Sequence, residues 1–185
     1  MTYNPDIHHR RSIRLRDYDY SSAGAYFVTI HAGNREGLFG SVTDGDMRLN
    51  NFGVVVDECW RAIPTHFPSV ELDEFVTMPN HFHGIIILDV PSKPVGAQHA
   101  APQFTTPGHA NVMSGSLGAI VRSFKSAASK RINEIRNDPG GPVWQRNYYE
   151  RIIRNDHELE RIREYIVNNP LQWDDDSDNP MNTPS

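Results

Sequence analysis

The stretch MPNHFHGIIIL, residues 78–88, decides the fold, because its last residues form the short apolar run of a buried β-strand. On a strand, side chains two positions apart project from the same face. His81 and His83 are separated by one residue, so the sequence predicts that both imidazoles point the same way near the start of this strand. Neutral imidazoles held side by side are good ligands for a divalent metal ion, and the pair therefore predicts a metal site.

The spacing of the two histidines has a plainer interpretation as well. A single histidine on a strand is usually a packed or surface residue, and a His-x-His pair also arises by chance. On spacing alone, both interpretations stay open, and a second signal is needed to choose between them.

A second signal lies in residues 156–170, whose apolar side chains have the spacing of an amphipathic helix. The stripe that would pack on a core consists of Leu159, Ile162 and Ile166. At about 100° per residue, Tyr165 falls at the edge of this stripe, with Asn169 one turn further along the same side. Such a tyrosine can pack its ring and keep its hydroxyl free, although an ordinary tyrosine at a core boundary is the commoner case. Because Pro170 disfavours helical angles at Asn169, we also expect a distorted last turn.

Three motifs follow one another in the chain: MPNHFHG at 78–84, VWQRNYYERIIR at 143–154, and Tyr165-Ile166-x-x-Asn169-Pro170. Together they resemble the single-tyrosine transposases of the HUH class. More narrowly, the chain is similar to the REP-associated tyrosine transposases, which are domesticated relatives of small insertion-sequence transposases. The similarity begins near Arg10 and runs in order to about Trp173, so it covers most of the chain.

The resemblance implies a role for each of these positions. His81 and His83 match the metal-binding histidines of the HUH motif, Tyr165 matches the nucleophile, and Asn169 matches the polar side chain that serves as a third metal ligand. The implied reaction cleaves and rejoins single-stranded or hairpin DNA through a 5′-phosphotyrosine intermediate. Some relatives act as dimers and others need no second subunit, so both a monomer and a homodimer stay open.

The chemistry suits these residue types. A tyrosine hydroxyl has an ordinary pKa of about 10, which makes it a poor nucleophile at neutral pH unless its target is polarised. A divalent ion on the scissile phosphate supplies that polarisation. An open site of two histidines and an amide, which must also accept a phosphate oxygen, favours Mg²⁺ or Mn²⁺. Zinc is a weaker candidate because the chain offers no thiolate cluster.

Composition bounds the class of protein. The 185 residues suffice for one domain with a substantial core. The single cysteine, Cys59, excludes an internal disulfide and fits a reducing compartment. No apolar run reaches membrane-spanning length, and the first residues lack the apolar core of a signal peptide. These features predict a cytoplasmic protein without a membrane partner.

Basic residues gather in groups although the formal net charge is −5. Residues 171–185 hold four aspartates and no basic residue, so the other residues together carry only −1. Cations bind phosphates and aromatic rings stack on unpaired bases, and the later basic groups stand near Trp144, Tyr148 and Tyr149. The residues that we predict to contact DNA are Arg10, Arg11, Arg14, Arg16, Lys125, Lys130, Arg131, Arg146, Arg151 and Arg154.

Each of these cations has a plainer interpretation as solvated surface charge, and the aromatic residues could equally belong to the core. An electrostatic groove is useful only where the scissile strand runs. We therefore expect residues 7–16 and 123–136 to lie on the same side of the domain as the metal site.

The remaining patterns predict strands at 26–32, 70–78, 84–90 and 143–149, a hairpin at 38–49, and helices at 54–63, 116–137 and in the tyrosine segment. This order predicts an α+β fold, a ferredoxin-like two-layer sandwich with a mainly antiparallel sheet and a C-terminal tyrosine-bearing helix. Residues 1–173 form the predicted single domain, with a flexible insertion at 91–115. An acidic tail at 174–185 is predicted to be disordered.

The sequence thus favours a metal-dependent DNA strand transferase. One alternative is a catalytically inactive protein on the same fold that binds nucleic-acid hairpins, which intact His81, His83, Tyr165 and Asn169 count against. Another is a cupin-type metal hydrolase, which also uses His-x-His. That scheme needs a glutamate a few residues further on, and residues 84–88 supply none.

Overall fold

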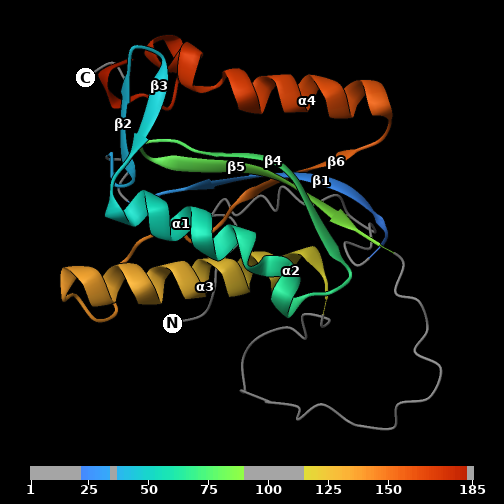
Figure 1. Ribbon diagram of the computed structural model, residues 1–185, viewed down its shortest axis with the longest axis horizontal. Coiled ribbons are helices and arrows are strands. Elements are labelled where there is room, and N and C mark those ends of the chain that lie inside the picture. Colours follow the sequence, from blue (N-terminus) through green and yellow to red (C-terminus); the bar gives the residue numbers. More distant parts are fainter. Residues whose placement is uncertain (1–21, 34–36, 90–114, 183–185) are drawn as a thin grey trace, which may run out of the picture.

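The computed structural model of the chain describes residues 22–33, 37–89 and 115–182. The predicted DNA-contacting Arg10, Arg11, Arg14 and Arg16, and residues 91–114 of the predicted insertion, lie outside this part. The elements, shown in Figure 1, are β1 (Gly24–His31), β2 (Gly40–Thr43), β3 (Asp46–Leu49), α1 (Asn51–Arg61), α2 (Ile63–His66), β4 (Val70–Thr77), β5 (His81–Leu88), α3 (Leu117–Arg136), β6 (Tyr149–Ile153), α4 (Asp156–Asn168) and the 3₁₀ helices η1 (Pro170–Asp175) and η2 (Pro180–Asn182).

Four strands form the main sheet in the order β4-β5-β1-β6, and all neighbouring strands are antiparallel. With α1 between β1 and β4, and α3 between β5 and β6, the chain has the βαββαβ topology of ferredoxin-like domains. The predicted fold class is confirmed. The same topology excludes the cupin interpretation, because a cupin is built from two β-sheets in a jelly roll.

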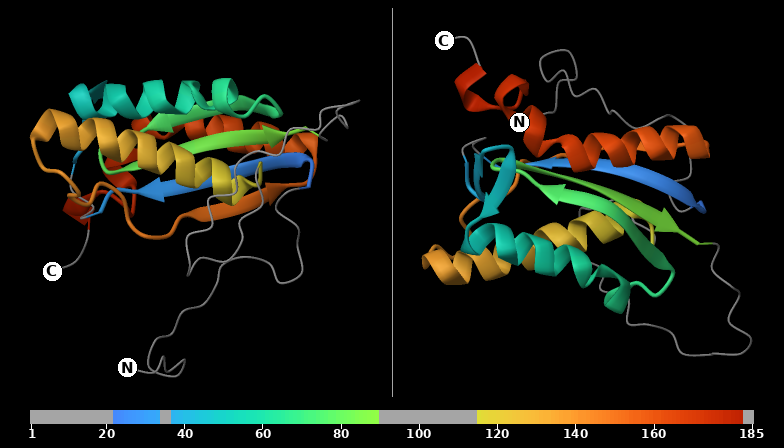
Figure 2. Two further views of the ribbon diagram at one scale, coloured as in Figure 1. Left: turned by 90° about the horizontal axis from the view of Figure 1, so that it is seen from below. Right: turned by 45° about the horizontal axis from the view of Figure 1, so that its top comes forward.

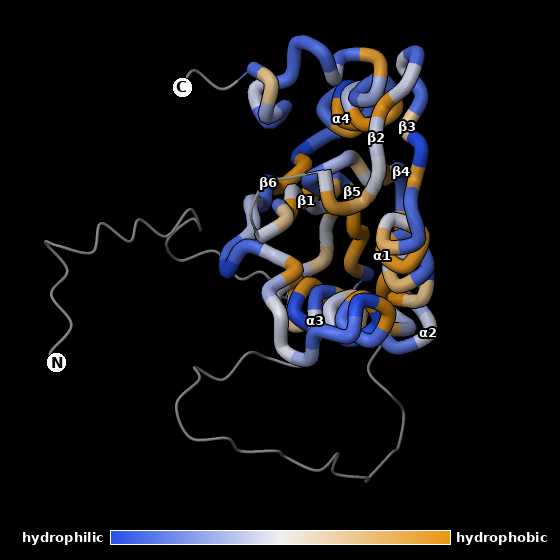
Figure 3. The backbone as a smooth tube through the Cα atoms, turned by 90° about the vertical axis from the view of Figure 1, so that its left-hand side faces the viewer, coloured by the Kyte–Doolittle hydropathy of each residue, from blue (hydrophilic) through white to orange (hydrophobic). Residues whose placement is uncertain are grey.

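The sheet lies between two unequal layers of helices. Figure 3 looks along the strands and shows α4 on one face and α1, α2 and α3 on the other. The left view of Figure 2 shows α1 and α3 side by side across their face of the sheet. Since side chains alternate along a strand, odd-numbered residues of β5 face α4, and even-numbered residues face α1 and α3.

The larger core fills the face covered by α1 and α3. It is centred on the Trp60 ring of α1, whose centroid lies 4.5 Å from that of Phe82 on β5 and 5.2 Å from that of Phe124 on α3. Trp144 joins this cluster from the segment before β6, 5.7 Å from Phe124. All four rings are buried, so one aromatic cluster joins two helices to the central strand.

A smaller core holds α4 on the opposite face. Ile162 and Ile166 of α4 pack on Ile85 of β5 and Ile153 of β6. At the edge of the sheet, Arg163 donates two hydrogen bonds to the Asp73 carboxylate, of 2.9 and 2.6 Å. Such a two-point contact restrains the rotation of the helix. Tyr165 lies at the edge of the buried stripe, as the spacing predicts.

Capping side chains mark where the three longer helices begin. Asn50 accepts hydrogen bonds from the backbone N–H groups of α1, as do Ser116 for α3 and Asn155 for α4. Each side chain satisfies donors that the first helical turn leaves without partners. The first helix therefore begins at Asn51, before the predicted residue 54.

Two local predictions are wrong. The last strand begins at Tyr149 instead of 143, because residues 143–148 make only an isolated bridge between Trp144 and Ala32 before the chain joins β1. Asn169 also keeps helical angles, with φ −58° and ψ −42°, since the chain continues directly into η1 with Pro170 at its start.

The predicted disorder after Trp173 is wrong for residues 174–182, which fold into turns and η2. These residues are held by polar contacts instead of by an apolar core. The Asn179 amide donates to the Trp173 carbonyl, and the Asp178 carbonyl accepts from Asn80. The composition of this segment predicts disorder because it contains few apolar residues. Composition does not reveal hydrogen bonds of this kind.

No helix in the three described ranges is both long and apolar enough to span a membrane.

Gly84 on β5 provides a test of this packing. A Cβ built there would lie 2.5 Å from the buried Trp60 ring, so Gly84→Ala should lower the free energy of unfolding by about 1–3 kcal/mol. At Gly33 the nearest atoms to an added Cβ are 3.7 Å away, and Gly33→Ala serves as the control. Urea unfolding of the three proteins measures the difference. Equal stabilities would contradict the close approach of Trp60 to β5.

Candidate active site

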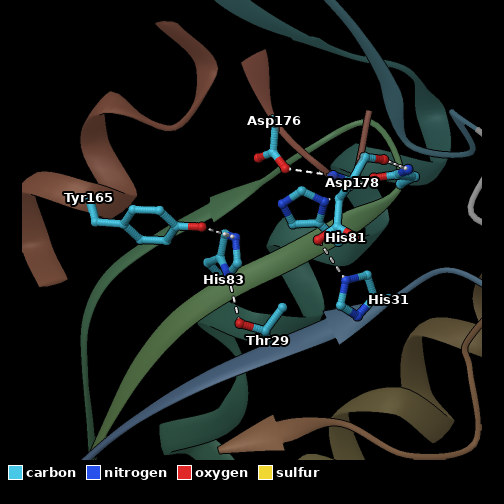
Figure 4. A network of polar contacts seen from close by, with 8 residues as sticks. Thr29, His31, His81, His83, Tyr165, Asp176 and Asp178 are labelled. Atoms are coloured by element: carbon cyan, nitrogen blue, oxygen red, sulfur yellow. Dashed lines mark hydrogen bonds and ion pairs between the residues drawn. The ribbon is translucent and has the colours of Figure 1, made fainter. Parts of the chain in front are cut away.

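The register between β1 and β5 gathers four polar side chains on the α4 face. His83 is paired with Thr29, and His81 is paired with His31. The imidazole centroids of His81 and His83 lie 4.5 Å apart, and that of His31 is 5.6 Å from His81. The two histidines of the motif therefore lie side by side on one face of the sheet, as the strand spacing predicts, and Figure 4 shows the cluster.

His83 contacts side chains at both ring nitrogens. Its Nδ1 lies 2.8 Å from the Thr29 hydroxyl, and its Nε2 lies 3.3 Å from the Tyr165 hydroxyl. Figure 4 shows the Tyr165 ring reaching from α4 across to His83. Tyr165 is 41% exposed, so its ring is anchored on one side while the residue stays accessible from solvent.

The hydrogen bonds of Asn80 determine which nitrogen of His81 carries the proton. The Asn80 amide nitrogen donates to the Asp178 carbonyl over 2.7 Å, so its oxygen faces His81 Nδ1 at 2.9 Å. An amide oxygen only accepts, and His81 therefore carries its proton on Nδ1. The lone pair of Nε2 is left available. That Nε2 is buried and makes no hydrogen bond.

Asn169 supplies a second buried atom without a partner. The residue is 1% exposed, and its Oδ1 makes no hydrogen bond of good geometry. The Asn169 side chain nevertheless lies close enough to His81 and Tyr165 to influence the pKa of each. An unsatisfied imidazole nitrogen and an unsatisfied amide oxygen at one place suit a cation. Within the described residues, no three His, Cys, Asp or Glu side chains form a metal-binding group, so a set built on these histidines needs the amide.

Burial dominates the electrostatics of the site. It lowers the pKa of His81 to about 4, against the opposing effect of Asp178 and Asp176, and it lowers the pKa of His83 well below its ordinary value. Both rings are therefore neutral at pH 7, the form that binds metals. Burial also raises the pKa of Tyr165. Its hydroxyl therefore stays protonated until a substrate or a cation changes the electrostatic potential around it.

The segment after α4 covers one side of this cluster. The Asp178 carboxylate lies 2.9 Å from His31 Nε2, and the Trp173 ring centroid is 6.0 Å from that of His81. Thr29, His31, Asn80 and Asp178 are absent from the predicted site. The alternation of apolar residues along β1 assigns Thr29 and His31 to one face, but only the register places them opposite the histidines of β5.

The prediction that residues 123–136 share the side of the metal site is wrong. Lys125, Lys130 and Arg131 lie on α3, which packs on the opposite face through Phe124. Two of them make contacts within the chain. Lys125 Nζ donates to the backbone carbonyls of residues 145–147, and Arg131 forms an ion pair with Glu58.

The basic residues around β6 are placed differently. Arg151 is on the α4 side but is bound to Glu158 through a 2.8 Å hydrogen bond. Arg146 and Arg154 are exposed at the two ends of β6. Their placement leaves both available for a phosphate, and the prediction that they contact DNA stays a prediction.

Comparison with known proteins gives a relative and a structural neighbour. An uncharacterized protein of Haemophilus influenzae (strain KW20 / Rd) is 47% identical over 177 residues, which cover 94% of this chain and 95% of the relative. No family model matches the chain. The structure of a REP-associated tyrosine transposase bound to a REP hairpin has a TM-score of 0.58 and 18% identity, covering 86% of this chain and 73% of that one. At this identity the similarity shows a shared fold.

The burial of His81 predicts a pH effect on stability in the metal-free protein. The unfolded chain binds a proton at His81 near pH 6.5 and the folded chain only near pH 4, so stability falls as the pH drops through this window. Between pH 7 and pH 5, His81 should account for about 2 kcal/mol of lost unfolding free energy.

Urea unfolding with EDTA at both pH values measures this loss. His81→Gln should lose about 2 kcal/mol less than the wild-type chain, whereas His157→Gln, a change of an exposed histidine on α4, should lose as much as wild type. Equal losses in wild type and His81→Gln would show that His81 titrates normally in the folded chain.

Proposed function

We propose that this chain, which belongs to the same family as the uncharacterized Haemophilus influenzae protein and has the fold of a REP-associated tyrosine transposase, is a metal-dependent DNA strand transferase. It would cleave and rejoin single-stranded or hairpin DNA with Tyr165 as its nucleophile. The observation that carries the proposal is that the candidate metal ligands and the candidate nucleophile lie at one place. Unpartnered atoms of His81 and Asn169 lie beside His83, and the Tyr165 hydroxyl reaches the same imidazole.

The donor atoms fit a hard divalent ion. His81 Nε2, His83 Nε2 and Asn169 Oδ1 would hold Mg²⁺ or Mn²⁺, and the Nδ1 contacts of the two histidines, to Asn80 and Thr29, fix their ring orientations. Bound there, the ion would neutralise negative charge on a non-bridging oxygen of the scissile phosphate. A cation would also satisfy two buried atoms that the protein alone leaves unpaired.

Tyr165 would carry the covalent step. Its oxygen forms a bond to phosphorus, and the bond from phosphorus to the 3′ oxygen breaks, which leaves a 5′-phosphotyrosine and a free 3′ end. The phenol loses one proton and the leaving 3′ oxygen gains one. Because a phosphodiester replaces a phosphodiester, a 3′ hydroxyl can later attack the phosphotyrosine and rejoin DNA without another energy source.

Tyr165 lies 3.3 Å from His83 of its own chain, which supports a reaction within one subunit. The proposal therefore places the nucleophile and the metal ligands on the same chain, and the homodimer stays a prediction. Hairpin DNA is the proposed substrate because the structural neighbour was solved with a REP hairpin, and because Tyr165 is accessible from outside the domain.

Tyr165→Phe tests the nucleophile. The change removes one oxygen and keeps the ring beside Phe27, so folding and DNA affinity should hardly change. With a labelled single strand and Mn²⁺, the covalent protein–DNA adduct should disappear, a loss of at least about 100-fold in adduct yield. Mass spectrometry of the wild-type adduct should locate the phosphate on Tyr165.

Tyr149→Phe is the matched control, because Tyr149 lies on the same face with its ring 5.8 Å from His31. It and Tyr148→Phe should both retain the adduct. An adduct formed by Tyr165→Phe, or a phosphate mapped to Tyr148 or Tyr149, would overturn the assignment.

The metal prediction separates catalysis from binding. His81→Ala should abolish both cleavage and the binding of Mn²⁺ measured by calorimetry, since it removes a ligand atom, while hairpin affinity falls less than about threefold. His66→Ala, at an exposed position on α2, should behave as wild type. Cleavage that persists in EDTA would contradict the proposal. Hairpin binding without any cleavage or metal binding would instead favour an inactive binding protein.

A further inference from the structure

The two histidines of β5 differ in what surrounds the Nε2 atom of each ring. The Nε2 atom of His81 is buried and makes no hydrogen bond. The Nε2 atom of His83 lies 3.3 Å from the Tyr165 hydroxyl, within hydrogen-bonding distance, as Figure 4 shows. One candidate metal ligand therefore has no bond to lose, whereas the other shares its nitrogen with the candidate nucleophile.

A nitrogen of a neutral imidazole carries either one proton or one lone pair. It can donate a hydrogen bond, accept one or bind a metal ion, but it does only one of these at a time. Metal binding needs the lone pair. A cation on His83 Nε2 therefore excludes the Tyr165 hydroxyl from that atom, whichever of the two groups donates the hydrogen bond between them.

The opposite nitrogen of His83 permits such an exchange. His83 Nδ1 lies 2.8 Å from the Thr29 hydroxyl, which can donate or accept a hydrogen bond. When Nδ1 carries the proton, Thr29 accepts, and Nε2 has the lone pair that a metal ion needs. When Nε2 carries the proton, Thr29 donates instead. His83 can thus take the metal-binding tautomer and keep its contact with Thr29.

The Tyr165 side chain can leave His83 without a movement of α4. Ile162 and Ile166 hold the helix in the smaller core, and Tyr165 is not part of that core. Its ring meets Phe27 edge-on, with the centroids 6.1 Å apart, and the residue is 41% exposed. Rotation about its side-chain bonds is therefore enough to carry the hydroxyl away from the imidazole.

We infer that the Tyr165 hydroxyl and a divalent cation compete for His83 Nε2, so that metal binding releases the nucleophile from the imidazole. The inference rests on the proposed function for its metal site, and it adds a coupling between that site and Tyr165. The coupling is reciprocal, because a hydroxyl that weakens cation binding is itself displaced to the same extent by the cation. A bound metal ion thus frees the hydroxyl for a phosphate of the DNA.

Calorimetry of Mn²⁺ binding in the absence of DNA tests the competition. Tyr165→Phe removes the competing hydroxyl and keeps the ring, so this variant should bind Mn²⁺ about three- to tenfold more tightly than the wild-type chain, the range expected for one hydrogen bond. Tyr149→Phe is the matched control, because it removes an oxygen on the same face from a ring beside His31. It should bind Mn²⁺ as the wild-type chain does.

Equal or weaker binding of Mn²⁺ by Tyr165→Phe would overturn the inference. Weaker binding would instead indicate that the Tyr165 oxygen supports the cation.

Nuclear magnetic resonance follows the hydroxyl itself. With ¹³C at the ring carbon that bears the hydroxyl of each tyrosine, saturating Mg²⁺ should shift the resonance that is missing from Tyr165→Phe. The resonance missing from Tyr148→Phe should not move, because Tyr148 packs against the core on the other face. His83→Ala should shift the Tyr165 resonance without Mg²⁺, since it removes the imidazole. A Tyr165 resonance that stays in place at saturating Mg²⁺ would contradict the release.

The calorimetry also separates this inference from the proposed function. If the wild-type chain and Tyr165→Phe bind Mn²⁺ equally well, the competition alone fails. If neither binds Mn²⁺, the proposed metal site fails and the inference fails with it. If Tyr165→Phe binds Mn²⁺ more tightly but the wild-type chain forms no adduct with any DNA, the competition stands and the proposed catalysis fails.

Discussion

The antiparallel pairing of β1 with β5 is the constraint on which both the core and the candidate site depend. These two strands are the inner strands of the sheet and are buried on both faces, so each residue serves one layer or the other. A slip of one residue would turn His81 and His83 toward Trp60 and would turn Phe82 toward α4. The stability of the aromatic core therefore enforces the register that brings the residues of the candidate site together.

Burying polar side chains in the middle of a sheet is costly unless each finds a partner. Thr29 and Asn80 provide partners for the Nδ1 atoms of the two histidines. His81 Nε2 and Asn169 Oδ1 are left without one, and each such group costs about 1–3 kcal/mol. The fold tolerates this loss because its apolar layers are extensive. A cation bound to these unpaired atoms would recover part of that free energy.

Periodicity along the chain was sufficient to predict β5, α3 and α4, and with them the positions of His81, His83 and Tyr165. Register could not be predicted, because it depends on pairing between segments fifty or more residues apart, so the sequence did not indicate that Thr29 and His31 lie at the site. The side taken by α3 could have been derived. Right-handed crossovers in a βαββαβ chain place both connecting helices on one face. The positive charges of α3 alone indicate the other face, and they do not determine how the helix packs.

The bond between His31 and Asp178 joins residues 147 positions apart. A ribosome makes a chain from its N-terminus at about 5–20 residues per second, and contacts between distant residues close late in folding. The βαββαβ core can assemble once β6 has emerged, whereas His31 must wait for Asp178. Asn80 waits for the same residue, whose carbonyl orients the amide beside His81. The sheet thus needs only the chain up to Ile153, whereas the final partners of its histidines need the chain up to Asp178.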